Sequence, residues 1–124
     1  MPTTPPQIAG HLEEFRNLLL AQRRRIFAQV AQLEDDLRWL DEDVEPEVVE
    51  EGQEQTIARL LERLDERGRA EIAAIDRALA RIEGGEYGVC RACGQPIPLA
   101  RQRAVPTADT CLPCAKMREG LERT

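Results

Sequence analysis

The sequence predicts an all-α-dominated fold: a long antiparallel coiled-coil hairpin, followed by a small C-terminal module with four cysteines and a short terminal helix. Two long stretches carry apolar residues at three- and four-residue spacing, which is typical of paired amphipathic helices. Charged residues make up 32% of the 124-residue chain and aromatic residues only 3%, so a large globular core is not expected. All four cysteines lie in the last third of the chain.

The first apolar stretch predicts one continuous helix. Residues 1–7 are rich in proline and threonine and are expected to be flexible. A helical period then runs through Ile8, Leu12, Phe15, Leu19, Ile26, Leu33 and Leu40, with Val30 and Leu37 continuing the stripe. A helix over residues 8–40 would be roughly 50 Å long at 1.5 Å per residue. It needs a partner, because it is too long for a small globule.

The second apolar stretch supplies that partner. Residues 41–52, DEDVEPEVVEEG, contain one proline and seven acidic residues and interrupt the period. The period returns at Ile57, Leu61, Leu64, Ile72, Ile75, Leu79 and Ile82. Gly84 and Gly85 then end the helix, as glycines after a periodic run usually do. Helix, short connection and helix predict an antiparallel hairpin over residues 8–84, with the acidic segment at its tip.

Some residues of the hairpin have two interpretations. Gly68 lies near the helix–helix seam, where close approach of the other helix or simple tolerance would explain it. Trp39, near the tip, is expected to pack between the helices, and a contact with a partner protein is the alternative. Three consecutive arginines, Arg23, Arg24 and Arg25, spread around their helix. They are expected to pair across the hairpin with acidic residues, namely Glu62, Asp65 and Glu66.

Residues 85–124 form the second predicted domain, in which two Cys-x-x-Cys pairs are separated by 17 residues. The pairs are Cys90 with Cys93 and Cys111 with Cys114. Four thiolates complete the tetrahedral coordination of one structural Zn²⁺ ion and leave no position for a reactive water. The ligands alone do not distinguish zinc from iron. A thioredoxin-like dithiol is disfavoured, because it would normally have one such pair.

Other residues of this module are expected to surround the metal. Tyr87 is expected to pack on the module with its hydroxyl at the surface. Arg101 either donates hydrogen bonds to carbonyls of the cysteine turns or reaches a partner. A short helix is expected from Leu112 to about Glu119.

Composition excludes several functional classes. The net charge of −6 disfavours nucleic acid as the main partner, because a sequence-independent DNA binder needs a basic face, and direct specific DNA binding is not expected either. No apolar run is long enough to cross a membrane, and the N-terminus lacks the pattern of a signal peptide, so a cytoplasmic protein is expected. The sequence shows no nucleophile–base pair and no phosphate-binding loop. An enzyme is therefore not expected.

The residues around the cysteines resemble the zinc-finger signature of the bacterial DksA/TraR family. The resemblance is carried by LARIEGGEYGVC (residues 79–90), RACG (91–94), Ile97, Arg101, PTAD (106–109) and the final cysteine pair. The preceding hairpin is similar to the family's coiled coil in length and position. The resemblance implies a protein that binds RNA polymerase without binding promoter DNA. It further implies that the coiled coil enters the secondary channel and acts there, often together with the alarmone ppGpp.

The resemblance also implies roles for individual residues. Glu47, Glu50 and Gly52 match the tip positions where the family carries two aspartates and an alanine, and a solvated acidic loop is the alternative interpretation. Trp39, Arg67 and Arg101 are further candidate partner contacts. Positions that are basic in ppGpp-responsive members are Ala74, Val105 and Ala115 here, and only Arg67 is retained. One cation is a poor phosphate site, so action without ppGpp is expected.

Two other functions stay open at this stage. A coiled coil with a zinc finger is also suited to an adaptor that binds proteins other than polymerase, for example in homodimers. A four-thiolate site is also suited to a stress sensor, in which oxidation releases the metal.

Overall fold

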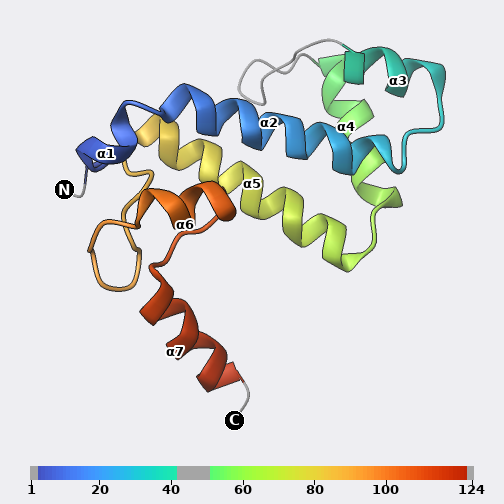
Figure 1. The fold of residues 1–124 in the computed structure, drawn as a ribbon. Coiled ribbons are helices and arrows are strands. Elements are labelled where there is room, and N and C mark those ends of the chain that lie inside the picture. The colour runs from blue at the N-terminus through green and yellow to red at the C-terminus, as the bar shows by residue number, and fades with distance from the viewer. Residues whose placement is uncertain (1–2, 42–50, 123–124) are drawn as a thin grey trace. The chain divides into compact units, whose positions relative to one another are not determined.

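The computed structural model describes residues 3–41 and 51–122, and this part of the chain is mostly helical, with a longer non-helical segment at residues 85–98 (Figure 1). The helices are α1 (Pro6–Ala9), α2 (Leu12–Ala28), α3 (Glu34–Asp41), α4 (Glu51–Arg63), α5 (Glu66–Gly84), α6 (Leu99–Ala104) and α7 (Leu112–Glu122). The described residues contain no strand, and Val89 and Pro96 form an isolated antiparallel bridge. The predicted helix-dominated fold is therefore confirmed. Among the described residues, no helix combines the length and the apolar character needed to cross a membrane.

The chain divides into two compact units, which we describe separately. The base unit comprises residues 1–19 and 77–124, and the arm unit comprises residues 20–76. Helices α2 and α5 each contribute residues to both units. The division therefore differs from the boundary expected at residue 84, because the first turns of α2 and the last turns of α5 group with the cysteine module.

The single helix predicted over residues 8–40 is wrong, because the chain forms three helices there. Helix α1 ends at Ala9 with Gly10 as its C-cap, and the backbone N–H of His11 donates to the carbonyl of Ile8 at 2.8 Å. A second break, at residues 29–33, separates α2 from α3. There the Arg63 guanidinium donates to the Val30 carbonyl at 3.5 Å, so a side chain from α4's last turn bonds to the backbone of the break.

The second predicted helix is also divided, at Leu64 and Asp65. The Asp65 carboxylate accepts a hydrogen bond of 2.8 Å from the backbone N–H of Gly68, which caps the N-terminus of α5. A Cβ atom on Gly68 would have Leu64 and Asp65 as nearest neighbours, at 3.1 and 3.3 Å. The preceding turn therefore leaves little room for a side chain at Gly68. Close approach of the opposite helix does not explain this glycine.

The core of the arm unit forms around aromatic side chains from two helices. The buried residues are Phe27, Trp39, Leu40, Leu60, Leu64 and Ile72. The rings of Phe27 and Trp39 meet edge to face with centroids 5.8 Å apart. The buried Arg23 guanidinium lies 5.0 Å from the centre of the Phe27 ring. Trp39 thus packs inside this unit.

Arg23 corrects the expected ion pairs across the hairpin. Its Nε donates to the Asp76 carboxylate at 2.9 Å, instead of pairing with an acidic residue between positions 62 and 66. The actual register of the two helices places Asp76 of α5 opposite Arg23 of α2. Periodicity identifies the buried stripe of each helix but does not determine this register.

The base unit packs the N-terminal segment against the residues before the first cysteine. The backbone N–H of Thr4 donates to the Gly85 carbonyl at 2.9 Å, so part of the segment expected to be flexible is hydrogen-bonded. The rings of Phe15 and Tyr87 lie 5.4 Å apart. Gly88, with φ of +91°, leaves room for Ile8, whose Cδ1 would lie 2.7 Å from an added Cβ.

The expectation that the Tyr87 hydroxyl lies at the surface is wrong. Tyr87 is fully buried, and its hydroxyl donates to the Pro106 carbonyl at 2.5 Å. Burial raises the pKa of Tyr87 well above its ordinary value. The hydroxyl therefore stays protonated and serves as a donor inside the base unit.

Candidate metal centre

The four cysteines converge on one point. Cys90 and Cys93 lie in the turn that follows Tyr87, Cys111 lies directly before α7, and Cys114 lies in the first turn of α7. Their sulfur atoms all lie within 4.8 Å of one another, and the Sγ atoms of Cys93 and Cys111 are 3.7 Å apart. A tetrahedron with Zn–S bonds of about 2.3 Å has S···S edges of about 3.8 Å. The spacing of the sulfurs therefore fits one tetrahedral metal ion.

The first cysteine turn is shaped by the backbone. The N–H of Cys90 donates to the Gln95 carbonyl at 2.8 Å, and the N–H of Gly94 returns to the Cys90 carbonyl at 2.9 Å. Gly94 has φ of +78°, a conformation that a residue without Cβ adopts easily. The N–H of Ile97 donates to the Gly88 carbonyl at 2.8 Å and closes the base of the turn. These bonds hold both sulfurs of the first pair on the same side.

Two arginines tie the second cysteine turn to the rest of the module. The backbone N–H of Arg91 donates to the Asp109 carbonyl at 2.8 Å, and its guanidinium contacts the Asp109 carboxylate at 2.9 Å. The Nε of Arg101 donates to the Thr110 carbonyl at 2.9 Å, directly before Cys111. Of the two roles expected for Arg101, the structure provides the bond to a cysteine-turn carbonyl. A partner contact by Arg101 stays a prediction.

Neither α6 nor the role of Gln102 was predicted from the sequence. Gln102 is fully buried, and its Nε2 donates to the carbonyls of Ala108 and Pro106 at 3.0 and 3.2 Å. It thereby holds the PTAD loop that leads to the second cysteine pair. The run LARQRA directly after Pro98 consists of good helix formers and was the available signal for α6.

The thiols influence one another strongly. Burial opposes ionisation of Cys90, but hydrogen bonds from the backbone of Cys111, Cys93 and Ala92 outweigh it and lower its pKa to about 6. The neighbouring thiols of Cys111 and Cys90 raise the pKa of Cys114 to about 12. Four thiolates so close together repel one another unless a cation lies between them. The donor set therefore suits a divalent metal that binds all four sulfurs.

The centre is suited to a structural role. Four protein sulfurs complete a tetrahedral shell, so a bound ion has no open position for a substrate. His11, the one histidine of the chain, lies 3.5 Å from Glu14 and is not part of the cluster. We expect the metal to stabilise the module rather than to perform chemistry.

The other predicted site residues lie outside this cluster. Glu47 and Glu50 are outside the described residues, and Gly52 is exposed near the start of α4. Trp39 is buried in the arm unit, with 8% of its surface exposed. The Arg67 side chain is 89% exposed and pairs with Glu71 in the next turn of α5 at 3.3 Å. Their proposed contacts with a partner stay predictions.

Replacing Arg101 with glutamine is expected to weaken metal binding. The change removes the bond to the Thr110 carbonyl and loosens the backbone before Cys111. Loss of such an outer contact typically lowers metal affinity about tenfold. Competition with a chromophoric zinc chelator measures the change. Arg103→Gln is the matched control, because Arg103 is on the same helix but pairs with Glu14. Equal affinities for the two variants would contradict this role of Arg101.

Comparisons with known proteins agree with this centre. Residues 85–120 match the family described as prokaryotic dksA/traR C4-type zinc finger. The RNA polymerase-binding transcription factor DksA of Caulobacter vibrioides is 34% identical over 112 residues, covering 90% of this chain and 78% of the relative. The factor of the same name from Escherichia coli strain K12 is 30% identical over 115 residues, covering 92% and 75%.

A solved structure extends the similarity to the fold. Transcription factor DksA2 from Pseudomonas aeruginosa matches with a TM-score of 0.60 and 27% identity, covering 97% of this chain and 94% of that one. Together with the sulfur geometry, the match to the four-cysteine zinc finger confirms the predicted structural zinc.

Proposed function

Because the chain belongs to the DksA/TraR family, we propose that it is a transcription regulator that binds bacterial RNA polymerase through the secondary channel and acts without ppGpp. The similarity to relatives named RNA polymerase-binding transcription factors, which extends over 90% of this chain, carries the proposal. The likeness includes the helices before the zinc finger as well as the finger itself. In this proposal the protein is a regulator in the bacterial cytoplasm and not an enzyme.

We assign a different role to each of the two units on the basis of their chemistry. The base unit carries a closed zinc centre, which supports a stabilising role. The arm unit is built from helices and leads to the acidic segment at residues 41–52. We assign the action on polymerase to this segment, in which Glu47 and Glu50 take the place of the family's aspartates. Their carboxylates retain the acidic charge on a side chain that is one methylene longer.

Independence from ppGpp is supported by the charge at the corresponding positions. Ala74, Val105 and Ala115 carry no charge, so they cannot pair with phosphate groups. Arg67 is exposed and already pairs with Glu71. A single exposed cation provides little affinity for a ligand with several phosphates.

Competitive binding to polymerase tests the proposed partner. The zinc-loaded protein is titrated onto bacterial core RNA polymerase in the presence of a known secondary-channel factor. Mutual displacement is expected if both occupy the same channel. An absence of binding at high micromolar concentration would overturn the proposal and favour the adaptor function.

The tip is tested by a charge-neutral double variant. Glu47→Gln with Glu50→Gln is expected to keep polymerase affinity and to lose the effect on transcription initiation. Glu54→Gln with Glu62→Gln is the matched control, because both residues are exposed on α4 outside the family's tip positions. Unchanged transcription with the first pair, while binding persists, would show that the tip carboxylates have no role.

In the same assay, a ppGpp effect that is lost in Arg67→Ala would contradict action without ppGpp.

A further inference from the structure

Two exposed leucines in the arm unit contradict the sequence pattern. Leu33 and Leu37 belong to the apolar stripe of the first stretch, yet they are 47% and 51% exposed. At about 100° per residue, one continuous helix would place Ile26, Val30, Leu33, Leu37 and Leu40 within an arc of about 80°. The break between α2 and α3 therefore exposes side chains that an unbroken helix would place on its buried face.

Trp39 shows the opposite behaviour. In one continuous helix it would lie about 140° from the centre of the apolar stripe, on the outer face. In the broken arrangement it is 8% exposed and packs edge to face on Phe27. The break thus exchanges one set of buried side chains for another: Trp39 is covered, while Leu33 and Leu37 are uncovered.

The residues of the break do not themselves oppose a helix. Residues 29–33 read QVAQL and include neither glycine nor proline. Their helix propensities cost well under 1 kcal/mol per residue relative to alanine. Contacts from elsewhere in the arm unit must therefore keep this segment out of the helix.

Those contacts form a cluster around Asp36, which we call the latch: Asp36, Arg59 and Arg63. Asp36 is fully buried. Its two oxygens contact the Arg59 guanidinium at 3.1 Å and the Arg63 guanidinium at 2.7 Å. Burial opposes its ionisation, but the hydrogen bonds from Arg63 and Arg59 outweigh burial and lower its pKa. The Asp36 carboxylate is therefore ionised at neutral pH, and its ion pairs with the two arginines join α3 to α4.

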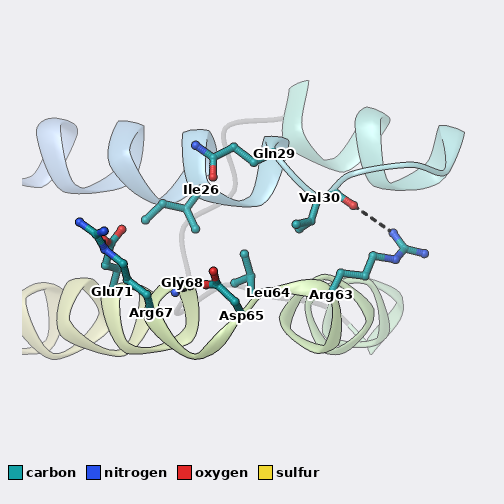
Figure 2. A pocket seen from close by; sticks show the side chains of 9 residues that line it. All are labelled: Ile26, Gln29, Val30, Arg63, Leu64, Asp65, Arg67, Gly68 and Glu71. Carbon is teal, nitrogen blue, oxygen red and sulfur yellow. Dashed lines mark hydrogen bonds and ion pairs between the residues drawn. The ribbon is translucent and has the colours of Figure 1, made fainter.

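The latch also bonds to the backbone atoms that a continuous helix would need. Arg63 donates to the Val30 carbonyl at 3.5 Å, and that carbonyl would otherwise accept from the N–H of residue 34 (Figure 2). The N–H of Leu33 donates to Asp36 at 3.4 Å instead of to the carbonyl of residue 29. Two helical hydrogen bonds are thus replaced by bonds to the latch.

A hollow lies between the break that separates α4 from α5 and the break that separates α2 from α3. Ile26, Val30 and Leu64 form the apolar part of a hollow of about 400 Å³ whose other lining residues are mostly polar, namely Gln29, Arg63, Asp65, Arg67, Gly68 and Glu71 (Figure 2). Leu64 is also the position at which α4 ends and the chain turns into α5.

We propose that residues 29–40 exchange between the observed broken arrangement and a merged arrangement, in which α2 and α3 form one helix, and that the latch determines the ratio of the two. The merged arrangement buries Leu33 and Leu37 and releases Trp39. The exchange is a property of the isolated protein and does not depend on the proposed function. One consequence does rest on that function: Trp39, a candidate partner contact, is accessible to a partner only in the merged arrangement.

Asp36→Asn tests the latch, with Trp39 as the reporter because it is the only tryptophan. The variant retains the size of the side chain but loses both ion pairs. Loss of a buried ionic partner of this kind is expected to shift the ratio of the two arrangements at least tenfold. Trp39 emission should move to longer wavelength and its quenching by acrylamide should rise severalfold. Helix content measured by circular dichroism should rise as the break becomes helical.

Two further variants separate exchange from loss of structure. Glu71→Gln removes the exposed ion pair with Arg67 from the same unit outside the latch, so Trp39 emission should not change. Leu37→Gln alone should have no effect, because Leu37 is exposed in the broken arrangement. Added to Asp36→Asn, it should restore the emission of the parent, since it disfavours the merged helix. Unchanged quenching in Asp36→Asn would overturn the proposal, and so would exposure of Trp39 with a fall in helix content.

Discussion

Replacing Cys111 with serine is expected to abolish zinc binding and to unfold the cysteine module of the base unit. The buried cluster of this module consists of Cys90, Ile97 and Cys111, with Cys114 packed against it, so most of its apolar contacts are made by the ligands themselves. Structural zinc contributes on the order of 10 kcal/mol or more in zinc-finger peptides at neutral pH. Without the metal, the two cysteine turns lose most of what holds them together, while the hydrogen bonds of Tyr87 and Gln102 to the PTAD loop remain.

Zinc content and limited proteolysis together test this prediction. The parent protein should retain one zinc ion per chain after gel filtration, and Cys111→Ser should retain none. New cleavage should appear between Tyr87 and Cys114. Ala92→Ser is the matched control, because it places a serine at an exposed position between two ligands. If Cys111→Ser kept the metal content and melting temperature of the parent, the assignment of this ligand would be wrong.

Replacing Gly88 with alanine is expected to destabilise the base unit by about 2–5 kcal/mol, from backbone strain and overpacking together. Gly88 has φ of +91°, where an L-residue with a side chain is strained. Its new methyl group would also lie 2.7 Å from Cδ1 of the buried Ile8 and 3.2 Å from Pro5. Both neighbours are held by the hydrogen-bonded N-terminal segment and have little room to move.

Two controls separate the strain from the clash. Gly85→Ala introduces the same residue at φ of +75° with no atom within 4 Å of the new Cβ, so it should show the cost of strain alone. Ile8→Val removes the Cδ1 atom and should recover part of the loss in the Gly88→Ala background. Thermal and denaturant unfolding of the zinc-loaded proteins give these free energies. Equal losses for Gly88→Ala and Gly85→Ala would show that the contact with Ile8 is unimportant.

The metal centre was predictable from sequence because its ligands come from short repeated motifs. Two Cys-x-x-Cys pairs define the donor set wherever the intervening chain goes, and the structure brings the four sulfurs together. The residues that hold the cysteine turns in place were harder to predict from the sequence. Arg101 had two interpretations, and Gln102 had none, because its role depends on carbonyls that the folded PTAD loop turns toward it.

The helices show the same division between local and tertiary information. Apolar period and the glycines at 84 and 85 determined by themselves that the chain is helical and where α5 ends, since both signals act within a few residues along the chain. Only the tertiary structure decided the break between α2 and α3, the pairing of Arg23 with Asp76 and the burial of the Tyr87 hydroxyl. Each of these depends on a hydrogen bond or ion pair between residues distant in sequence, such as Arg63 with Val30. A periodic pattern contains no information about which such partners meet, because many registers of two helices bury the same apolar stripe.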